Sequence, residues 1–363
     1  MFNPSETFIQ AQAAALDRYR PLIVGLEDKG NARAELRDRL LVAGSRSERV
    51  ACRLFGRCEA MAERLRPFAP LLIHAHFGTD GLAALPLARA LDIPLVTTLH
   101  GYEVSRSRAR MLVSGRTAWT RYALFQRHLA RGGALFLAVS DAVRRRALAR
   151  GYPEERTITH HVGVDTGRFR PGDAAEPGLV LHVGRLVEKK GTANLIDAFA
   201  RARVPGSRLV ILGEGPLRVA LERQAAALGL GESIAFLGAL PPDEVAAWMR
   251  RAWLIAAPSL TARDGDSEGL PTVLVEAAAS GLPAVATDHA GIPEAVAEGR
   301  TGFLVPERDT GALANRLSVL LGSAELRARM AVAARTQAQE RFDLARQTAL
   351  LEDHYDRLLG AAR

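Results

Sequence analysis

Two glutamates enclose the stretch EGLPTVLVE, residues 268–276, and could bind the hydroxyl groups of a phosphorylated sugar. If a helix begins here, the amides of Thr272 and Val273 form an anion site, because the helix dipole is positive at that end. Glu268 and Glu276 would repel a phosphate at this site unless they accept hydrogen bonds from hydroxyl groups. The pattern predicts a sugar-nucleotide site, with amides for the phosphate, one glutamate for a hexose and the other for a ribose.

A second candidate phosphate site is the stretch HVGRLVEKKG, residues 182–191. It carries Arg185 and two of the three lysines in the chain, one of which is Lys190. A glycine-bounded loop with a guanidinium and an ammonium group suits a diphosphate. Each feature also has a simpler interpretation. The loop could be an exposed basic turn, Glu276 an exposed helix residue, and Glu268 a charge partner of a helix N-terminus.

Alternating strands and helices are needed to position these residues. Short apolar runs such as PLVTTLH, residues 94–100, and LVLHVG, residues 179–184, alternate with helical patterns along most of the chain. Strands separated by single helices imply parallel sheets covered on both faces, and a Pro/Gly-rich break at 170–178 divides two such sheets. Ligands bind beyond the carboxyl ends of such strands, where the candidate loops fall. We expect an α/β protein with two Rossmann-like domains that face each other across a cleft.

The net charge of +8 is concentrated in the first half of the chain. Residues 1–170 hold 27 Lys+Arg against 16 Asp+Glu, a net of +11, whereas residues 171–363 hold 21 against 24, a net of −3. Arginines crowd residues 46–66 and 106–127. Solvated helix faces are one interpretation, and a surface that meets anionic lipid headgroups or a lipid diphosphate is the other. Nucleic acid is disfavoured because aromatic residues are sparse and no binding signature appears.

The sequence also indicates the cellular compartment of the protein. No apolar run approaches the roughly 20 residues that cross a bilayer, and no signal peptide precedes the first motif. Cys52 and Cys58 lie six residues apart in an apparently helical segment, so their side chains should point apart and stay reduced. We expect a cytoplasmic protein that can lie peripherally on the inner face of the cell membrane.

The motifs together resemble one known family. The stretch DGDSEGLPTVLVEAAASGLPAVAT, residues 264–287, resembles the Glu–seven residues–Glu motif of retaining glycosyltransferases of family four, which have the two-domain GT-B fold. VGRLVEKKG, LVILGEGPLR, IAFLGALP and TGFLVP match that family in order and spacing. HAHFGTDG, TLHGYEV, AVSDAVRRRAL and HHVGVDTGRF resemble its colanic-acid and exopolysaccharide branch. The resemblance covers nearly the full chain.

The resemblance implies roles for individual residues. Arg185 and Lys190 would hold the leaving diphosphate and stabilise the charge that develops on it. Glu268 would contact the donor sugar, as would His100 from the first domain, and Glu276 would contact the ribose. The remaining nucleotide-binding residues are implied to act mainly through their backbone, with Leu237 and Gly238 meeting the base: Gly184, Leu237, Gly238, Gly269, Leu270, Thr272 and Val273.

The resemblance also implies a reaction. A sugar would pass with retained configuration from a UDP- or GDP-sugar to a lipid-linked or polysaccharide acceptor, in exopolysaccharide or cell-surface glycan synthesis. The DGD at 264–266 resembles a metal-binding motif, but relatives carry the same loop without a metal, so we expect no metal and no cofactor. A nucleotide-sugar epimerase of the same fold and a non-catalytic nucleotide-sugar binding module are the alternatives.

The Pro/Gly-rich break at 170–178 sets the boundary between the two expected domains, and the resemblance implies their roles. The acceptor-binding domain would span 1–170, the nucleotide-sugar domain 178–340, and a C-terminal helix, 341–363, would pack back onto the first domain. MFNPSETFIQAQ, residues 1–12, resembles a turn and first helix that an apolar strand precedes in relatives. That strand lies mid-sheet in the Rossmann order, so we expect its absence to weaken the first domain and an added upstream apolar segment to restore it.

Overall fold

The computed structural model describes residues 6–28, 30–45, 51, 58–173 and 175–361, which form two compact units. The first contains Met1–Gly163 and Leu344–Arg363, and the second contains Val164–Asp343. We expected the division at 170–178, but it falls earlier because Val164 pairs with Asp343 in a β-bridge and its amide donates to Phe342. The segment after Gly163 is therefore part of the second unit.

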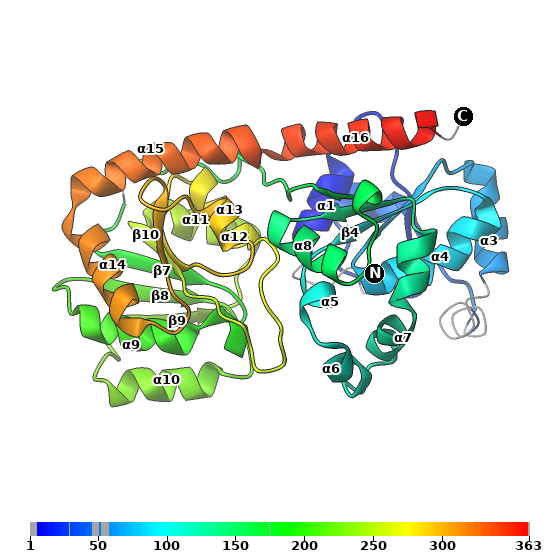
Figure 1. Ribbon diagram of the computed structural model, residues 1–363. Helices are drawn as coiled ribbons and strands as arrows, with labels where there is room; N and C mark the ends of the chain where they lie inside the picture. The colour runs from blue at the N-terminus through cyan, green and yellow to red at the C-terminus, as the bar shows by residue number, and fades with distance from the viewer. Residues whose placement is uncertain (1–5, 29, 46–50, 52–57, 174, 362–363) are drawn as a thin grey trace. The chain divides into compact units, whose positions relative to one another are not determined.

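The first unit is built on a four-stranded parallel sheet in the order β3-β4-β5-β6 (Figure 1). Leu99, Phe136 and Leu137 in its two central strands are completely buried, as parallel strands covered on both faces should be. Its strands are β3 (Ile73–His76), β4 (Leu95–Leu99), β5 (Leu135–Ala138) and β6 (Thr157–Thr159). The helices that connect or flank them are α3 (Glu59–Leu65), η3 (Arg66–Phe68), α4 (Gly78–Leu91), α5 (Tyr102–Ser105), α6 (Arg108–Leu112), α7 (Thr117–Gly132), α8 (Asp141–Ala149) and η4 (Glu154–Arg156).

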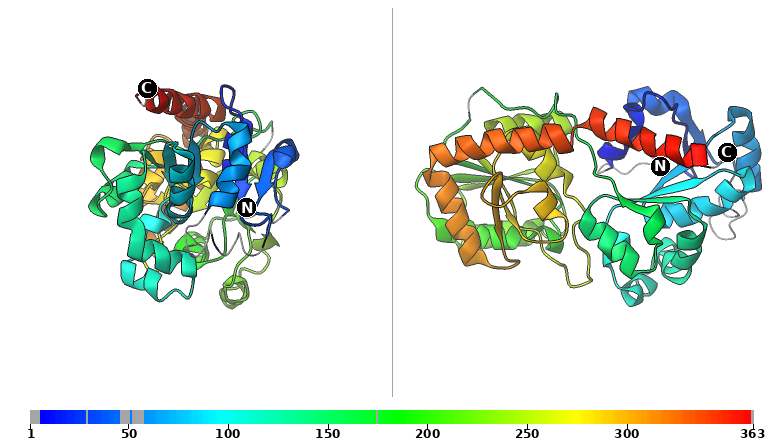
Figure 2. Two further views of the ribbon diagram at one scale, coloured as in Figure 1. Left: turned by 90° about the vertical axis from the view of Figure 1, so that its right-hand side faces the viewer. Right: turned by 45° about the horizontal axis from the view of Figure 1, so that its top comes forward.

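The C-terminal helix α16 (Leu344–Ala361) belongs to this first unit, beside α1 (Thr7–Ala14) in Figures 1 and 2. Leu351 and Tyr355 on α16 pack against Val96 and Leu137 of the sheet. The buried carboxylate of Glu352 accepts hydrogen bonds from the amides of residues 17–19. The helix thus anchors the segment after α1 to the sheet.

A second, two-stranded sheet lies beside the first. Strand β1 (Ile23–Gly25) pairs in parallel with β2 (Leu40–Val42), which follows η1 (Ala34–Arg39), and among the described residues neither strand pairs with β3. Side chains flanking β1 still share an apolar cluster with Ile73 of β3. No strand therefore links β1 to β3 in the part of the chain that the structure describes. The expected lack of a first strand stays a prediction, because residues 1–5 lie outside that part.

The second unit contains a six-stranded parallel sheet in the order β12-β11-β10-β7-β8-β9. Helices α9, α10 and α14 cover one of its faces, and α11 and α12 cover the other (Figure 1). Its strands are β7 (Leu179–Val183), β8 (Arg208–Leu212), β9 (Ile234–Gly238), β10 (Leu254–Ala257), β11 (Ala284–Thr287) and β12 (Gly302–Val305). Its helices are η5 (Glu188–Lys190), α9 (Thr192–Ala202), α10 (Arg218–Ala227), α11 (Pro242–Arg251), α12 (Thr272–Ala279), α13 (Ile292–Ala295), α14 (Thr310–Gly322) and α15 (Ala324–Arg341). The α/β class with two parallel-sheet units is confirmed.

The cysteine prediction is wrong for Cys58, which is disulfide-bonded and buried. The prediction placed Cys52 and Cys58 in one regular helix, but α3 begins only at Glu59 and Cys58 has non-helical backbone angles. Helical spacing therefore does not govern its direction. Cys52 lies outside the described residues.

None of the described helices combines the length and the apolar character that crossing a membrane requires.

Candidate active site

The strand order of the second unit creates a crevice at one position of its sheet. From β7 the chain proceeds to β8 and β9 on one side, whereas from β10 it proceeds to β11 and β12 on the other. In parallel sheets, ligands bind where the order reverses in this way, beyond the carboxyl ends of the two strands. The loops that begin there are residues 184–191 after β7 and residues 258–271 after β10. They contain both candidate stretches from the sequence.

An ion pair joins the two loops at this position. Lys190 Nζ lies 2.8 Å from Glu268 Oε1, and both side chains are largely withdrawn from solvent. Ser259 Oγ donates a further hydrogen bond of 3.2 Å to the same carboxylate oxygen. Burial alone would raise the pKa of Glu268, but Lys190, Lys189 and the Ser259 hydroxyl outweigh it and lower the pKa to about 2. Glu268 is therefore ionised throughout the neutral range.

Further contacts fix the two loops to each other. Lys189 Nζ lies 3.2 Å from Asp266 Oδ1, and the amide of Leu260 donates to the Lys189 carbonyl at 2.8 Å. Gly191 has a φ of 63°, and a Cβ there would approach the Pro258 carbonyl oxygen to 1.9 Å. A glycine is required at that position because any side chain would force the loops apart.

Two further residues that were not predicted from the sequence, His289 and Glu307, form a chain of hydrogen bonds that begins at the Glu268 backbone amide. The Glu268 amide lies 3.5 Å from His289 Nε2, and His289 Nδ1 lies 2.8 Å from Glu307 Oε1. Glu307 also accepts a hydrogen bond from the amide of Thr261. His289 follows β11 and Glu307 follows β12, while Ser259 follows β10. Polar residues just beyond the carboxyl end of a strand are the sequence signal that identifies Ser259, His289 and Glu307.

Arg185 is the predicted diphosphate ligand whose charge remains available. Its side chain is exposed, and among the described residues no carboxylate pairs with it. The Lys190 charge, by contrast, is already balanced by Glu268, and that of Lys189 by Asp266. A diphosphate that enters this crevice would therefore meet Arg185 as its main unbalanced cation.

Helix α12 begins where the sequence placed an anion site. The amide of Leu274 bonds back to Pro271, and the amides of Thr272 and Val273 precede this first turn. Gly269 and Leu270, just before the helix, are buried.

Glu276 lies further along α12 and is partly exposed. Burial raises its pKa to about 7, against an opposing effect of Arg168. Among the described residues no hydrogen bond or ion pair joins its carboxylate to the other predicted site residues. The structure thus brings Lys190 and Glu268 into direct contact. Glu276 is connected to them only along the chain, because α12 follows the loop that carries Glu268.

Close backbone contacts hold the remaining glycines of the site. A Cβ on Gly213 would lie 1.9 Å from the Gly184 carbonyl oxygen, and the Gly213 amide donates to the Gly238 carbonyl at 2.7 Å. A Cβ on Gly184 would lie 3.3 Å from Cδ of Lys190. Leu237 is 40% exposed at the end of β9. The ends of β7, β8 and β9 therefore form a continuous backbone edge next to the Lys190 loop.

His100 belongs to the first unit, where it follows β4. Its Nε2 lies 3.2 Å from Nδ1 of His76, at the end of the neighbouring strand β3. Burial, together with the charge of His76, lowers the pKa of His100 well below its ordinary value. At neutral pH its imidazole is uncharged and can exchange hydrogen bonds with a neutral hydroxyl group.

Glu103, three residues after His100, organises the loop that carries it. This fully buried carboxylate accepts hydrogen bonds from the amides of His100 at 2.8 Å and Gly101 at 3.0 Å. Burial raises its pKa to about 7, against the lowering effect of these amides. Gly101 has a φ of 122°, which suits only glycine. Glu103 was not predicted from the sequence as a site residue, although it lies three residues after His100 in the stretch TLHGYEV.

Among the described residues no group of three side chains is suited to hold a metal ion. Asp266, the second aspartate of the DGD stretch, is paired with Lys189. Its carboxylate therefore has a partner within the protein.

Comparison with known proteins identifies similar sequences along both units. Residues 164–337 match the model of the family described as glycosyl transferases group 1, and residues 6–168 match that of glycosyltransferase family 4. The chain is 37% identical over 265 residues to the putative colanic acid biosynthesis glycosyltransferase WcaL of Salmonella typhimurium, with 71% of this chain and 63% of WcaL covered. It therefore spans less than two thirds of that relative's length.

A mycobacterial relative is covered more completely. The chain is 34% identical over 284 residues to the GDP-mannose-dependent alpha-(1-6)-phosphatidylinositol monomannoside mannosyltransferase of Mycolicibacterium smegmatis, with 73% of this chain and 72% of the relative covered. Among solved structures, Anabaena HepE in complex with UDP superposes with a TM-score of 0.80 at 23% identity, over 98% of this chain and 96% of HepE. The GT-B fold expected from the sequence is confirmed.

Proposed function

We propose a specific transfer reaction for this chain, which belongs to family 4 of the glycosyltransferases. In the proposed reaction, a hexose passes from a nucleotide-sugar donor to a lipid-linked or polysaccharide acceptor, with retention of its anomeric configuration. The reaction would serve exopolysaccharide or cell-surface glycan synthesis, on the cytoplasmic side of the membrane. The similarity to WcaL favours this setting.

The Lys190–Glu268 pair at the point where the strand order reverses is the observation that carries the proposal. A carboxylate with a pKa of about 2 stays ionised at neutral pH and accepts hydrogen bonds from sugar hydroxyls. The adjacent ammonium group offsets the repulsion between this carboxylate and an incoming diphosphate. Arg185 supplies the unbalanced positive charge for the diphosphate itself.

Front-face attack is the mechanism that we propose. The bond between the anomeric carbon and the phosphate oxygen breaks, and its electron pair stays on that oxygen. The acceptor hydroxyl oxygen forms the new bond on the same face, and its proton passes to the departing phosphate. Arg185 and Lys190 stabilise the negative charge as it develops. Glu268 orients the donor sugar, and the contact of His100 with that sugar stays a prediction from the sequence.

The donor base has two candidates. HepE was solved with UDP, and the mycobacterial relative is named for GDP-mannose. In this chain the base would meet the backbone near Leu237 and Gly238. A backbone contact of this kind is compatible with both nucleotides. We propose that neither nucleotide needs a bound metal, because the unbalanced Arg185 charge would take its place at the diphosphate.

A thermal-shift screen of UDP, GDP and their sugars tests the proposal, with EDTA in one arm and Mg²⁺ or Mn²⁺ in the other. A raised melting temperature with one nucleotide in EDTA is expected. Arg185→Gln should reduce this shift, whereas Arg201→Gln, an exposed arginine on α9, should not. A shift that appears only with metal would refute metal independence.

Donor turnover then separates the candidate functions. A transferase should release nucleotide diphosphate, slowly to water and faster when lipid-linked or glycan acceptors are added. Conversion of the donor into a sugar epimer without release of diphosphate would identify an epimerase. Donor binding without any cleavage across a broad acceptor panel would identify a binding module.

A further inference from the structure

Residues 104–140 of the first unit form a stretch without any acidic side chain. They hold seven arginines and no lysine, aspartate or glutamate. This stretch builds α6, the turn after it, α7 and β5. Arg108, Arg110 and Arg116 are exposed on α6 and the turn. The positive charge of this region is therefore local, and carboxylates of the same segment do not balance it.

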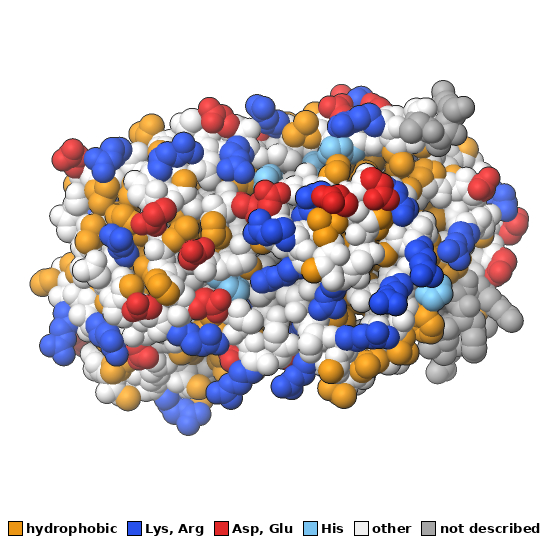
Figure 3. All heavy atoms as spheres, viewed as in Figure 1, with side chains coloured by type: hydrophobic (Ala, Val, Ile, Leu, Met, Phe, Trp, Pro, Cys, Tyr) orange, Lys and Arg blue, Asp and Glu red, His pale blue; other side chains and the backbone are white. Residues whose placement is uncertain are grey.

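Large apolar side chains are exposed among these arginines. Val113, in the turn between α6 and α7, is 78% exposed, and Leu124 and Phe125 on α7 are 49% and 45% exposed. Figure 3 shows apolar side chains at the lower edge of the molecule, where α6 lies in Figure 1, next to a row of basic side chains over α7. Apolar residues that project beside cations are typical of protein surfaces that contact lipid.

Helix α7 has two distinct faces that explain this exposure. At about 100° per residue, Leu124, Arg127 and Arg131 point to the same side of the helix. The residues of the opposite side are buried in the unit: Trp119, Tyr122, Ala123, Leu129 and Ala130. The inner face therefore fixes the helix in the fold, and the outer face presents an apolar residue flanked by guanidinium groups.

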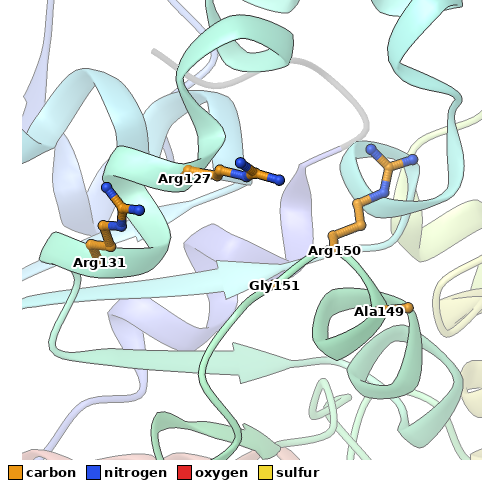
Figure 4. Close-up of a pocket in the computed structure, with 5 residues that line it drawn as sticks. All are labelled: Arg127, Arg131, Ala149, Arg150 and Gly151. Atoms are coloured by element: carbon orange, nitrogen blue, oxygen red, sulfur yellow. The ribbon is translucent and has the colours of Figure 1, made fainter.

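The outer face of α7 borders a pocket of about 340 Å³ that three arginines line (Figure 4). Arg127 and Arg131 come from α7, and Arg150 from the residue after α8. Arg150 is held in place, because its guanidinium donates to the carbonyls of Val104 and Arg106. In Figure 4 the Arg127 side chain points toward Arg150.

No carboxylate lines this pocket, and among the described residues neither Arg127 nor Arg131 forms an ion pair. Three like charges in one pocket repel each other, and an anion with several oxygens relieves that repulsion. A phosphate group has the oxygens to bridge two guanidinium groups at once.

We propose that this face, formed by α6, the 113–116 turn, the outer side of α7 and the three-arginine pocket, docks onto an anionic lipid surface. The pocket binds the phosphate of a lipid headgroup, and Val113, Leu124 and Phe125 enter the boundary between headgroups and acyl chains. The proposal rests on the proposed function for its purpose, because a lipid-linked acceptor would be presented at such a surface.

Sedimentation with vesicles tests the proposal, with phosphatidylcholine alone compared with a mixture that contains phosphatidylglycerol. Binding to the anionic mixture is expected, with a decline as salt rises. Arg127→Gln/Arg131→Gln should weaken it roughly 30-fold, since each arginine near such a surface contributes about a factor of five. Val113→Ser/Phe125→Ser should weaken binding even at low salt, where the charges are unscreened.

The matched control is Arg201→Gln/Arg223→Gln, which removes the same charge from exposed positions on α9 and α10 of the second unit. It should bind anionic vesicles like the unmodified chain. Equal weakening by the control and the pocket variant, or equal binding to neutral vesicles, would overturn the proposal. All variants should keep the thermal shift with nucleotide. Loss of that shift in the unmodified chain would instead count against the proposed function.

Discussion

Replacing Glu268 by glutamine tests whether a buried ion pair holds the two loops of the candidate site together. The substitution keeps the size of the side chain and removes its charge, so that Lys190 loses the carboxylate 2.8 Å away. Removal of one partner of a buried pair costs about 3 kcal/mol, because the other charge remains desolvated. We expect the second unit of Glu268→Gln to unfold at lower urea concentration at pH 7.

The pH dependence of the free energy of unfolding isolates the contribution of this ion pair. The pKa of Glu268 falls from an ordinary 4.5 to about 2 in the folded chain. A folded-state pKa below the unfolded value stabilises the fold at high pH, by roughly 3 kcal/mol at pH 7. This contribution is lost as the pH falls below 4.5, and about 2 kcal/mol of it should be gone at pH 3. Glu268→Gln should not show this part of the loss of stability at low pH.

Urea unfolding at pH 7, 5, 4 and 3 measures this difference. A Trp119→Phe background leaves only Trp248 and Trp253, both in the second unit, as fluorescent reporters. Glu232→Gln serves as the control, because Glu232 is exposed and forms no ion pair among the described residues. The reasoning is refuted if Glu268→Gln and the control show the same decline in stability between pH 7 and pH 3.

The same variant separates binding from turnover. Without Glu268 the Lys190 ammonium is unbalanced, so the affinity for nucleotide diphosphate should stay the same or rise. Donor turnover should fall strongly, because the proposed role of Glu268 is to accept hydrogen bonds from the sugar hydroxyls. Calorimetric titration with the diphosphate and an assay of its release from the donor measure the two effects. A parallel loss of diphosphate and donor binding would place Glu268 outside the sugar site.

Substitutions at three other residues, Glu276, Gly191 and Glu103, give further predictions. Glu276→Ala should weaken diphosphate and donor binding together if the residue contacts the ribose. Glu276→Gln should also remove a loss of stability that develops as the pH rises through about 7, because the folded-state pKa is raised. Gly191→Ala should destabilise the second unit by about 2–3 kcal/mol in urea, since its Cβ would lie 1.9 Å from the Pro258 oxygen. Glu103→Ala should lower turnover and the melting temperature by leaving the amides of His100 and Gly101 without acceptors, while Glu103→Gln, which can still accept, should retain more of both. Unchanged turnover in Glu103→Ala would remove it as a positioning residue.

Local patterns in the sequence were sufficient for the class of fold. The alternation of apolar runs and helical segments predicts parallel sheets, and the structure contains them in both units. The loops with Lys190 and Glu268 were also identifiable, because ligand loops follow the carboxyl ends of strands. Glu103 and His289 lie just as near strand ends, but each stands beside a motif that predicts a site more specifically.

The pairing of strands and the balance of charges were decided only by the tertiary structure. Lys190 and Glu268 are far apart in the sequence and meet because β7 pairs with β10, a choice that depends on long-range packing. The sequence assigned the diphosphate equally to Arg185 and Lys190, whereas the structure balances the lysine with a carboxylate and leaves the arginine unpaired among the described residues. The three-arginine pocket likewise forms only where α7 and the end of α8 come together. Residue types and their periodicity determine which side chains face the core and which face solvent. Contacts between segments that are distant in the sequence arise only from the packing of the whole unit.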